Sequence, residues 1–244
     1  MAFSQLRIAR AGWSIPAASK TEFAAADGAS GLARYATRFN AVEINSTFYR
    51  PHRPQTLRKW ADDVPADFRF SVKLPRTITQ FARLRDAQPL LDAFLPQTDA
   101  LGAKLGALLL QLPPSLVWEA TVAGAFFEEM RARWPQTPIA CEPRHPTWGQ
   151  HEAEAQLSAF GIMRVAADPP RWPGNQLPAA AGPGYWRLHG SPRIYYSEYS
   201  EDDLRTLAAA LPDAGAAWVV FDNTASGHAV ANALVLQHLL HPAQ

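Results

Sequence analysis

Short apolar runs alternate with segments of helical spacing along almost the whole chain, and this alternation limits the possible folds more than any other feature of the sequence. Between most of the runs, apolar residues recur at helical intervals, as in Val122, Phe126, Phe127 and Met130. Eight runs have the length and composition of buried strands, at residues 6–9, 41–45, 68–74, 107–112, 138–142, 162–168, 185–190 and 217–223. Such alternation predicts a parallel sheet with helical crossovers.

Eight strand and helix units in 244 residues fit a closed TIM-like barrel. The rival is a doubly wound open sheet, which usually has fewer strands and often carries a glycine-rich phosphate loop. Neither GxGxxG nor GxxxxGK[ST] occurs in the sequence. Residues 168–184 are too rich in Pro and Gly for a regular helix, so we expect a barrel without a regular sixth helix. No linker divides the chain, which predicts one domain over residues 1–244.

Composition narrows the function classes. The net charge is +1, from 23 basic and 22 acidic residues, so no overall charge favours nucleic acid or an anionic membrane surface. No apolar run approaches the roughly 18 to 20 residues of a membrane helix. The single cysteine, Cys141, cannot form an internal disulfide, and the first residues lack the apolar centre of a signal peptide. We therefore expect a cytoplasmic protein.

Polar residues gather where the predicted strands end. In a TIM-like barrel all of these ends lie at one face, where barrel enzymes keep their chemistry. The residues are Trp13, Ser14, Glu43, Asn45, Tyr49, Lys73, Gln111, Glu142, Arg144, His145, Asp168, Arg187, His189, Asp222 and Asn223. Because each buried charge costs several kcal/mol unless it is paired, this concentration predicts a ligand pocket. The alternative is a structural network of paired charges, for example Lys73 with Glu43 and Arg187 with Glu142.

The stretch AVEINSTFYR at residues 41–50 carries much of this polarity. Glu43, Asn45, Thr47 and Tyr49 alternate along it. Alternate residues of a strand point to the same side, so we expect these four side chains to share one face.

Six runs together resemble the DUF72 family, also called the YecE-like proteins. They are VEINSTFYRP, FSVKLPRTIT, LGALLLQLPPS, EPRHPTW, RLHG and FDNT, in this order and spread over nearly the whole chain. The resemblance implies a TIM-like barrel with the family's shared residues at one mouth, and it implies no activity. Gln80 stands where the family usually has His, Pro143 replaces an aromatic residue, and Asp222 replaces the first Asn of an FNN run. A mechanism that needed the missing His as a base is in doubt here.

The first functional hypothesis is an enzyme that acts by acid and base chemistry on a small anionic or sugar-like substrate, without a metal or other cofactor. Glu43 and Glu142 would be the acid and base, with His189 as the alternative proton carrier, because imidazole titrates near neutral pH.

Binding of that substrate is assigned to the other strand-end residues. Lys73, Arg144 and Arg187 could clamp a phosphate or carboxylate. Trp13, Tyr49 and Trp148 could stack on a sugar or base, or could equally be packing residues. Because three cations are grouped in it, such a pocket predicts a small anionic ligand as the partner, and no membrane partner is expected.

Two alternatives remain open. In a metal-assisted isomerase, lyase or hydrolase, carboxylates and a histidine would supply the ligands, but no HExxH spacing occurs and three nearby cations would oppose a metal's charge. Those ligands would be Glu43, Glu142, Asp168, His189 and Asp222. In a non-catalytic nucleotide or nucleic-acid binding module, the basic residues within 50–59 and 69–85 would hold phosphates. The near-zero net charge favours solvated faces instead, which makes nucleic acid an unfavoured partner.

Overall fold

The computed structural model describes residues 6–24, 29–172, 184–211 and 217–240, which form two compact units. The first unit contains residues 6–24, 29–43, 166–170, 184–211 and 217–240. The second unit contains residues 44–165 and 171–172.

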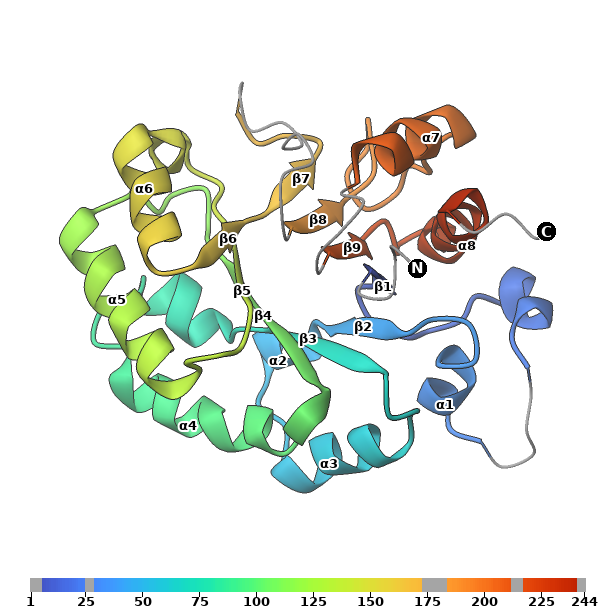
Figure 1. The fold of residues 1–244 in the computed structure, drawn as a ribbon, viewed down its shortest axis with the longest axis horizontal. Coiled ribbons are helices and arrows are strands. Elements are labelled where there is room, and N and C mark those ends of the chain that lie inside the picture. The colour runs from blue at the N-terminus through green and yellow to red at the C-terminus, as the bar shows by residue number, and fades with distance from the viewer. Residues whose placement is uncertain (1–5, 25–28, 173–183, 212–216, 241–244) are drawn as a thin grey trace. The chain divides into compact units, whose positions relative to one another are not determined.

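Both units are built on parallel strands (Figure 1). One sheet has the order β1-β9-β8-β7, and each of its neighbouring pairs is parallel. The other has the order β2-β3-β4-β5-β6, with parallel pairing from β3 through β6. The strands are β1 (Leu6–Arg10), β2 (Ala41–Ile44), β3 (Arg69–Lys73), β4 (Leu105–Gln111), β5 (Ile139–Glu142), β6 (Ile162–Arg164), β7 (Ala166–Asp168), β8 (Gly184–Leu188) and β9 (Ala217–Phe221).

Most strand residues are buried, as expected where both faces of a parallel sheet are covered. Helices supply the cover, and in Figure 1 the helices α3 to α6 follow one side of the strands β3 to β6. The helices are α1 (Gly31–Tyr35), α2 (Ser46–Tyr49), α3 (Pro54–Asp62), α4 (Gln88–Asp99), α5 (Ala120–Arg133), α6 (His151–Ala159), α7 (Glu201–Ala210) and α8 (His228–Leu240). Short helical turns are η1 (Ala17–Glu22), η2 (Thr77–Phe81), η3 (Gly102–Lys104) and η4 (Pro146–Gly149).

Local sequence signals explain where several helices begin. Helix α7 starts at a capping box, in which the Ser200 side chain accepts from the Asp203 amide and the Asp203 side chain accepts from the Ser200 amide. Helix α3 starts with Pro54, whose missing amide hydrogen costs nothing in the first turn. Both helices lie between predicted strands, as the predicted alternation requires.

The predicted alternation of strands and helices is confirmed, and the fold is an α/β fold with parallel sheets. The predicted strand at residues 162–168 is two strands in different sheets. The chain follows β5 as far as Val165, whose amide donates to the Cys141 carbonyl, and Ala166 then pairs with Trp186 of β8. Closure of the strands into one barrel stays a prediction.

The stretch at residues 41–50 does not continue as a strand. Strand β2 ends at Ile44, and Ser46–Tyr49 form helix α2. The Thr47 hydroxyl donates to the Ile44 carbonyl at 3.0 Å, a local bond of the kind that competes with strand formation. Thr47 is buried whereas Tyr49 is 65% exposed. The prediction that Glu43, Asn45, Thr47 and Tyr49 share one face is therefore wrong.

Two other expectations, the missing sixth helix and the absence of a membrane helix, can be compared only with the described residues. Residues 173–183 of the segment expected to lack a helix lie outside the described residues, so that expectation stays a prediction. Among the helices that the structure describes, none has both the length and the apolar character needed to cross a membrane.

Candidate functional site

Strand β8 places a row of polar side chains on one face of the first unit. Tyr185, Arg187 and His189 are alternate residues, so they point to the same side of the sheet. Asp222 follows the neighbouring strand β9, and its amide donates to the Leu188 carbonyl, which fixes it beside the end of β8.

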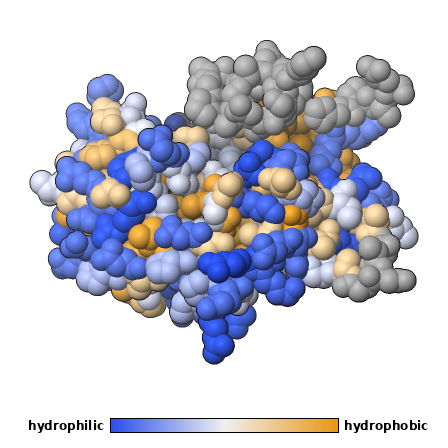
Figure 2. Space-filling model, turned by 60° about the horizontal axis from the view of Figure 1, so that its bottom comes forward, coloured by the Kyte–Doolittle hydropathy of each residue, from blue (hydrophilic) through white to orange (hydrophobic). Residues whose placement is uncertain are grey.

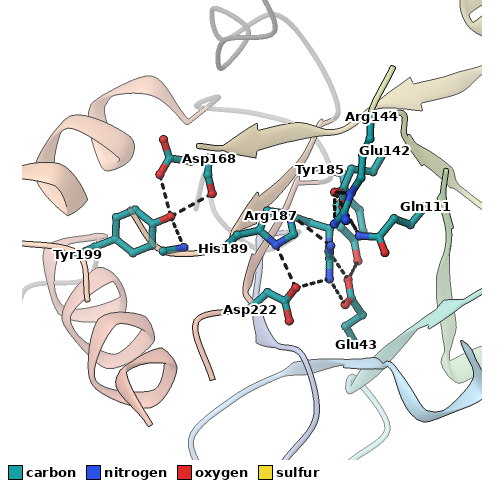
Figure 3. A network of polar contacts seen from close by, with 11 residues as sticks. Glu43, Gln111, Glu142, Arg144, Asp168, Tyr185, Arg187, His189, Tyr199 and Asp222 are labelled. Atoms are coloured by element: carbon teal, nitrogen blue, oxygen red, sulfur yellow. Dashed lines mark hydrogen bonds and ion pairs between the residues drawn. The ribbon is translucent and has the colours of Figure 1, made fainter. Parts of the chain in front are cut away.

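Arg187 is the centre of this group (Figure 3). Its Nε and Nη2 atoms donate to the two oxygens of Glu43 at 3.0 Å and 2.8 Å. Nη2 also donates to Oδ2 of Asp222 at 3.0 Å. The Tyr185 hydroxyl donates to Glu43 at 2.9 Å. Arg187 and Glu43 are both 0% exposed, so this guanidinium is held between carboxylates in the interior and does not present itself as an open anion clamp.

His189 continues the group on the same face. Its Nδ1 lies 3.0 Å from Oδ2 of Asp222. A carboxylate only accepts, so this contact places the imidazole hydrogen on Nδ1 and leaves Nε2 as an acceptor. Nε2 lies 3.5 Å from Nη1 of Arg187. The side chain is fully buried, and the ring of Tyr195 packs edge-on against it at a centroid distance of 5.9 Å. The group is therefore an ordered histidine and carboxylate pair, backed by an arginine.

Asp168 lies on the other face of the same sheet. It is in register with Leu188, whose side chain alternates with those of Arg187 and His189. The Tyr199 hydroxyl donates to Oδ2 of Asp168 at 2.7 Å (Figure 3). Burial first, and then the negative charge of Asp168, raises the pKa of Tyr199 above its ordinary value of 10.0, which keeps this phenol protonated at neutral pH. The side chains of Asp168 and His189 thus lie on opposite faces, although the His189 amide donates to the Asp168 carbonyl at 2.7 Å.

Two further residues of the first unit that we assigned to binding lie beyond strand ends. Asn223 donates to the Ser197 carbonyl at 3.0 Å and to the Asn232 side chain at 2.9 Å, which ties the end of β9 to helix α8. Trp13 is half-buried beyond the end of β1.

The second unit carries a separate polar group at the ends of β4 and β5. The Gln111 amide nitrogen lies 3.1 Å from both oxygens of Glu142, and Nε of Arg144 donates to Oε1 of Glu142 at 3.0 Å (Figure 3). Glu142 is buried, whereas Arg144 is partly exposed. Lys73 is buried at the end of β3, with Nζ 4.3 Å from the centre of the Phe48 ring.

The other candidates of the second unit differ in exposure. Nδ1 of His145 lies 3.0 Å from the Thr147 hydroxyl, beside the start of η4. Trp148 is 1% exposed, donates to the Leu116 carbonyl and packs against Phe127, so the packing role that we named as its alternative is the one seen. Asn45 is half-buried between β2 and α2, and the exposed Tyr49 lines a mostly apolar cleft beside α2.

Sequence reasoning missed two tyrosines. Tyr185 could have been found, because it precedes Arg187 by two residues on one strand and therefore shares its face. Tyr199 carried no comparable signal, since its contact with Asp168 joins residues far apart in the chain.

The structure therefore brings together two groups from our candidates: Glu43, Arg187, His189 and Asp222 in the first unit, and Gln111, Glu142 and Arg144 in the second. A single mouth that holds both groups stays a prediction. Among the described residues, no three His, Cys, Asp or Glu side chains are grouped so that they could hold a metal ion, and the metal-assisted alternative stays a hypothesis.

Known proteins identify the family of this chain. The family model described as "Protein of unknown function DUF72" matches residues 7–244. The chain belongs to the DUF72 family. The UPF0759 protein YecE of Escherichia coli K12 is 38% identical over 147 residues, which are 58% of this chain and 53% of that relative. The matched stretch thus spans about half of YecE.

Solved structures agree on the fold. A DUF72 family protein from Enterococcus faecalis V583 superposes with a TM-score of 0.78 at 21% identity, covering 98% of this chain and 96% of the other. One from Thermotoga maritima MSB8 gives 0.74 at 23% identity, covering 97% and 99%. A sugar phosphate isomerase/epimerase from Parabacteroides distasonis gives 0.51 at 13% identity, covering 98% and 95%. The family resemblance predicted from the sequence is confirmed, and these likenesses concern the fold alone.

Proposed function

We propose that this DUF72 protein is an enzyme that moves a proton on a small, sugar-like substrate, with His189 as the proton carrier. The observation that carries the proposal is the 3.0 Å contact between Nδ1 of His189 and Asp222. A carboxylate on Nδ1 fixes the tautomer in which Nε2 is the basic nitrogen, and it stabilises the imidazolium once Nε2 has taken a proton. Because Nε2 lies 3.5 Å from Nη1 of Arg187, this contact has to give way to the substrate before Nε2 takes a proton.

Arg187 and Glu43 act as positioning residues in this proposal. Arg187 donates to Asp222 and to both oxygens of Glu43, which holds the Asp222 carboxylate in place for His189. The guanidinium thus forms its ion pairs with Glu43 and Asp222, within the first unit. Of the two ligand classes that we expect from the sequence, the hydroxyl-rich, sugar-like class therefore suits His189 better than an anion clamped by Arg187.

Access to His189 requires movement of the turn that follows β8. The imidazole is buried, and Tyr195, which packs against it, sits in that turn at a positive φ of 71°. A non-glycine residue in this region of backbone space is uncommon and is found where turns are functional. In our proposal the turn at residues 190–197 opens to admit the substrate and closes to exclude water.

Hydrogen exchange into D2O tests the proposal across several classes of sugar at once. The protein is incubated with ketoses, aldoses and sugar phosphates, and loss of the C–H signal next to the carbonyl is followed by proton NMR. We expect one class to exchange with the wild type and to lose exchange with His189→Gln, because the glutamine amide cannot carry a proton.

The matched control is His151→Gln, which removes an exposed histidine from helix α6. This variant should exchange at the wild-type rate, and a thermal melt shows whether each variant folds. Exchange that persists in folded His189→Gln, or no exchange with any compound, would overturn the proposal.

A further inference from the structure

The second unit contains a cleft whose walls are mostly apolar. It lies between helix α2, the turn after β3 and helix α4, and its volume is about 200 Å³. Phe48, Pro51, Pro75, Leu90 and Phe94 supply the apolar wall. A cavity of this size with apolar walls suits one ring or a short aliphatic chain.

One polar side chain in the lining of this cleft has a donor that is not used within the protein. Gln97 lines the cleft and is 6% exposed. Its Oε1 accepts from the His52 amide at 2.8 Å, while its Nε2 has no hydrogen-bond partner among the described residues. This nitrogen is not fully buried, so it can donate to water or to a ligand in the cleft.

Two arginines stand at the edge of the same cleft. Arg50 and Arg76 line it, both are exposed, and neither forms an ion pair with any described residue. The guanidinium carbon of Arg76 lies 5.9 Å from the Tyr49 ring centre and 5.5 Å from the Phe81 ring centre. The two rings hold this guanidinium by cation–π contacts and leave its hydrogen-bond donors available.

The lining contains no acidic residue among those that the structure describes, so the cleft combines an apolar body with positive charge at its edge. Tyr49 and Phe81 are 65% and 68% exposed, although large aromatic side chains are usually covered. Figure 2 shows one face on which hydrophobic residues, outside the grey atoms, form small patches separated by hydrophilic ones.

We propose that this cleft is a binding site for a small apolar carboxylate, such as an aryl or short-chain alkyl acid. The apolar body lies against Phe48 and Phe94, and the carboxylate lies at the edge, where Arg76 and Arg50 donate to it. The site belongs to the second unit, so a test of this proposal does not depend on the chemistry proposed for His189.

Calorimetric titration of the full chain with three related probes tests the site. Phenylacetate has the apolar body and the charge, phenylacetamide is its neutral counterpart, and phenethylamine carries the opposite charge. We expect phenylacetate to bind about tenfold more tightly than phenylacetamide, and phenethylamine not to saturate the site, because a hydrogen bond to an ionised group is the stronger kind.

Variants locate the binding. Arg76→Gln should weaken phenylacetate binding about tenfold, while Arg58→Gln, which removes an exposed arginine from helix α3 outside the cleft, should leave it unchanged. Gln97→Glu keeps an acceptor for the His52 amide but places a negative charge inside the cleft, so it should abolish phenylacetate binding. A thermal melt of each variant separates loss of binding from loss of folding.

Three results would overturn the proposal. The first is equal affinity for the charged and neutral probes, and the second is absence of saturable phenylacetate binding in the millimolar range. The third is phenylacetate binding that responds equally to Arg76→Gln and Arg58→Gln.

Discussion

Arg187 in the first unit and Arg76 in the second show two different uses of the same side chain. Arg187 is buried, and its nitrogens donate to two carboxylates. Arg76 is exposed and lies between two aromatic rings, with no carboxylate partner among the described residues. A guanidinium enclosed by carboxylates holds its neighbours in place, whereas one held by rings keeps its donors for a ligand.

The largest expected effect is a difference in the free energy of unfolding between variants of these two arginines. Arg187→Ala leaves Glu43 buried without its two guanidinium hydrogen bonds, and we expect a loss of about 3 to 5 kcal/mol in the free energy of unfolding. Arg76→Ala removes only exposed cation–π contacts, and we expect a loss below about 1 kcal/mol. Urea unfolding of both variants measures the difference. Similar losses in the two variants would show that the contrast between them is mistaken.

An intermediate effect appears at high pH, because burial raises the pKa of two tyrosines of the first unit. Burial raises the pKa of Tyr35 and of Tyr199 above their ordinary value of 10.0. The folded protein thus keeps these protons to a higher pH than the unfolded chain does. Their stabilising contribution is complete below pH 10.0 and is lost as the pH rises further, at up to about 1.4 kcal/mol per pH unit for each group.

Urea unfolding across this pH range, with Tyr199→Phe, checks the assignment. The variant should lose stability less steeply than the wild type above pH 10.0, since one of the two groups is absent. Tyr49→Phe, at an exposed position in the second unit, is the control for loss of a phenol hydroxyl. An unchanged slope in Tyr199→Phe would contradict the burial argument.

The sequence predicted the strands well because strand length and apolar composition are local properties. It failed where a choice depends on distant partners. The run at residues 162–168 has no Gly or Pro at its centre. Nothing in it reveals that Arg164 pairs with β5 whereas Ala166 pairs with β8. The stretch at residues 46–49 alternates like a strand, but the local hydroxyl bond of Thr47 accompanies a helical turn instead.

The candidate site shows the same division. Alternation along β8 predicts that Arg187 and His189 share a face, and they do. The sequence could not assign their partners, because Asp222 and Glu43 come from other segments of the chain. It also grouped Asp168 with His189 by its place at a strand end, although the register of β7 with β8 turns Asp168 to the opposite face. The availability of Arg76 depends on which side chains surround it in space, which no sequence pattern records.

The smallest expected effect is a change in stability with pH that arises from His52, beside the cleft of the second unit. Burial, and then the positive charge of Arg50, lowers the pKa of His52 below its ordinary value of 6.5. The unfolded chain therefore takes up this proton at a higher pH than the folded protein. The stability that neutral His52 provides is present above pH 6.5 and declines as the pH falls, by a small amount because the ring is only partly buried.

A bound carboxylate should weaken this depression, because it offsets the charge of Arg50 beside the cleft. We expect the pKa of His52, followed by NMR of its ring protons, to move upward when phenylacetate saturates the protein and to stay in place with phenylacetamide. Arg50→Gln should produce the same upward movement without any ligand, since it removes the same charge. A downward movement of the His52 pKa with phenylacetate would show that the carboxylate does not lie beside Arg50. Arg50 would then differ from Arg187 in its exposure, but it would not be available to this ligand.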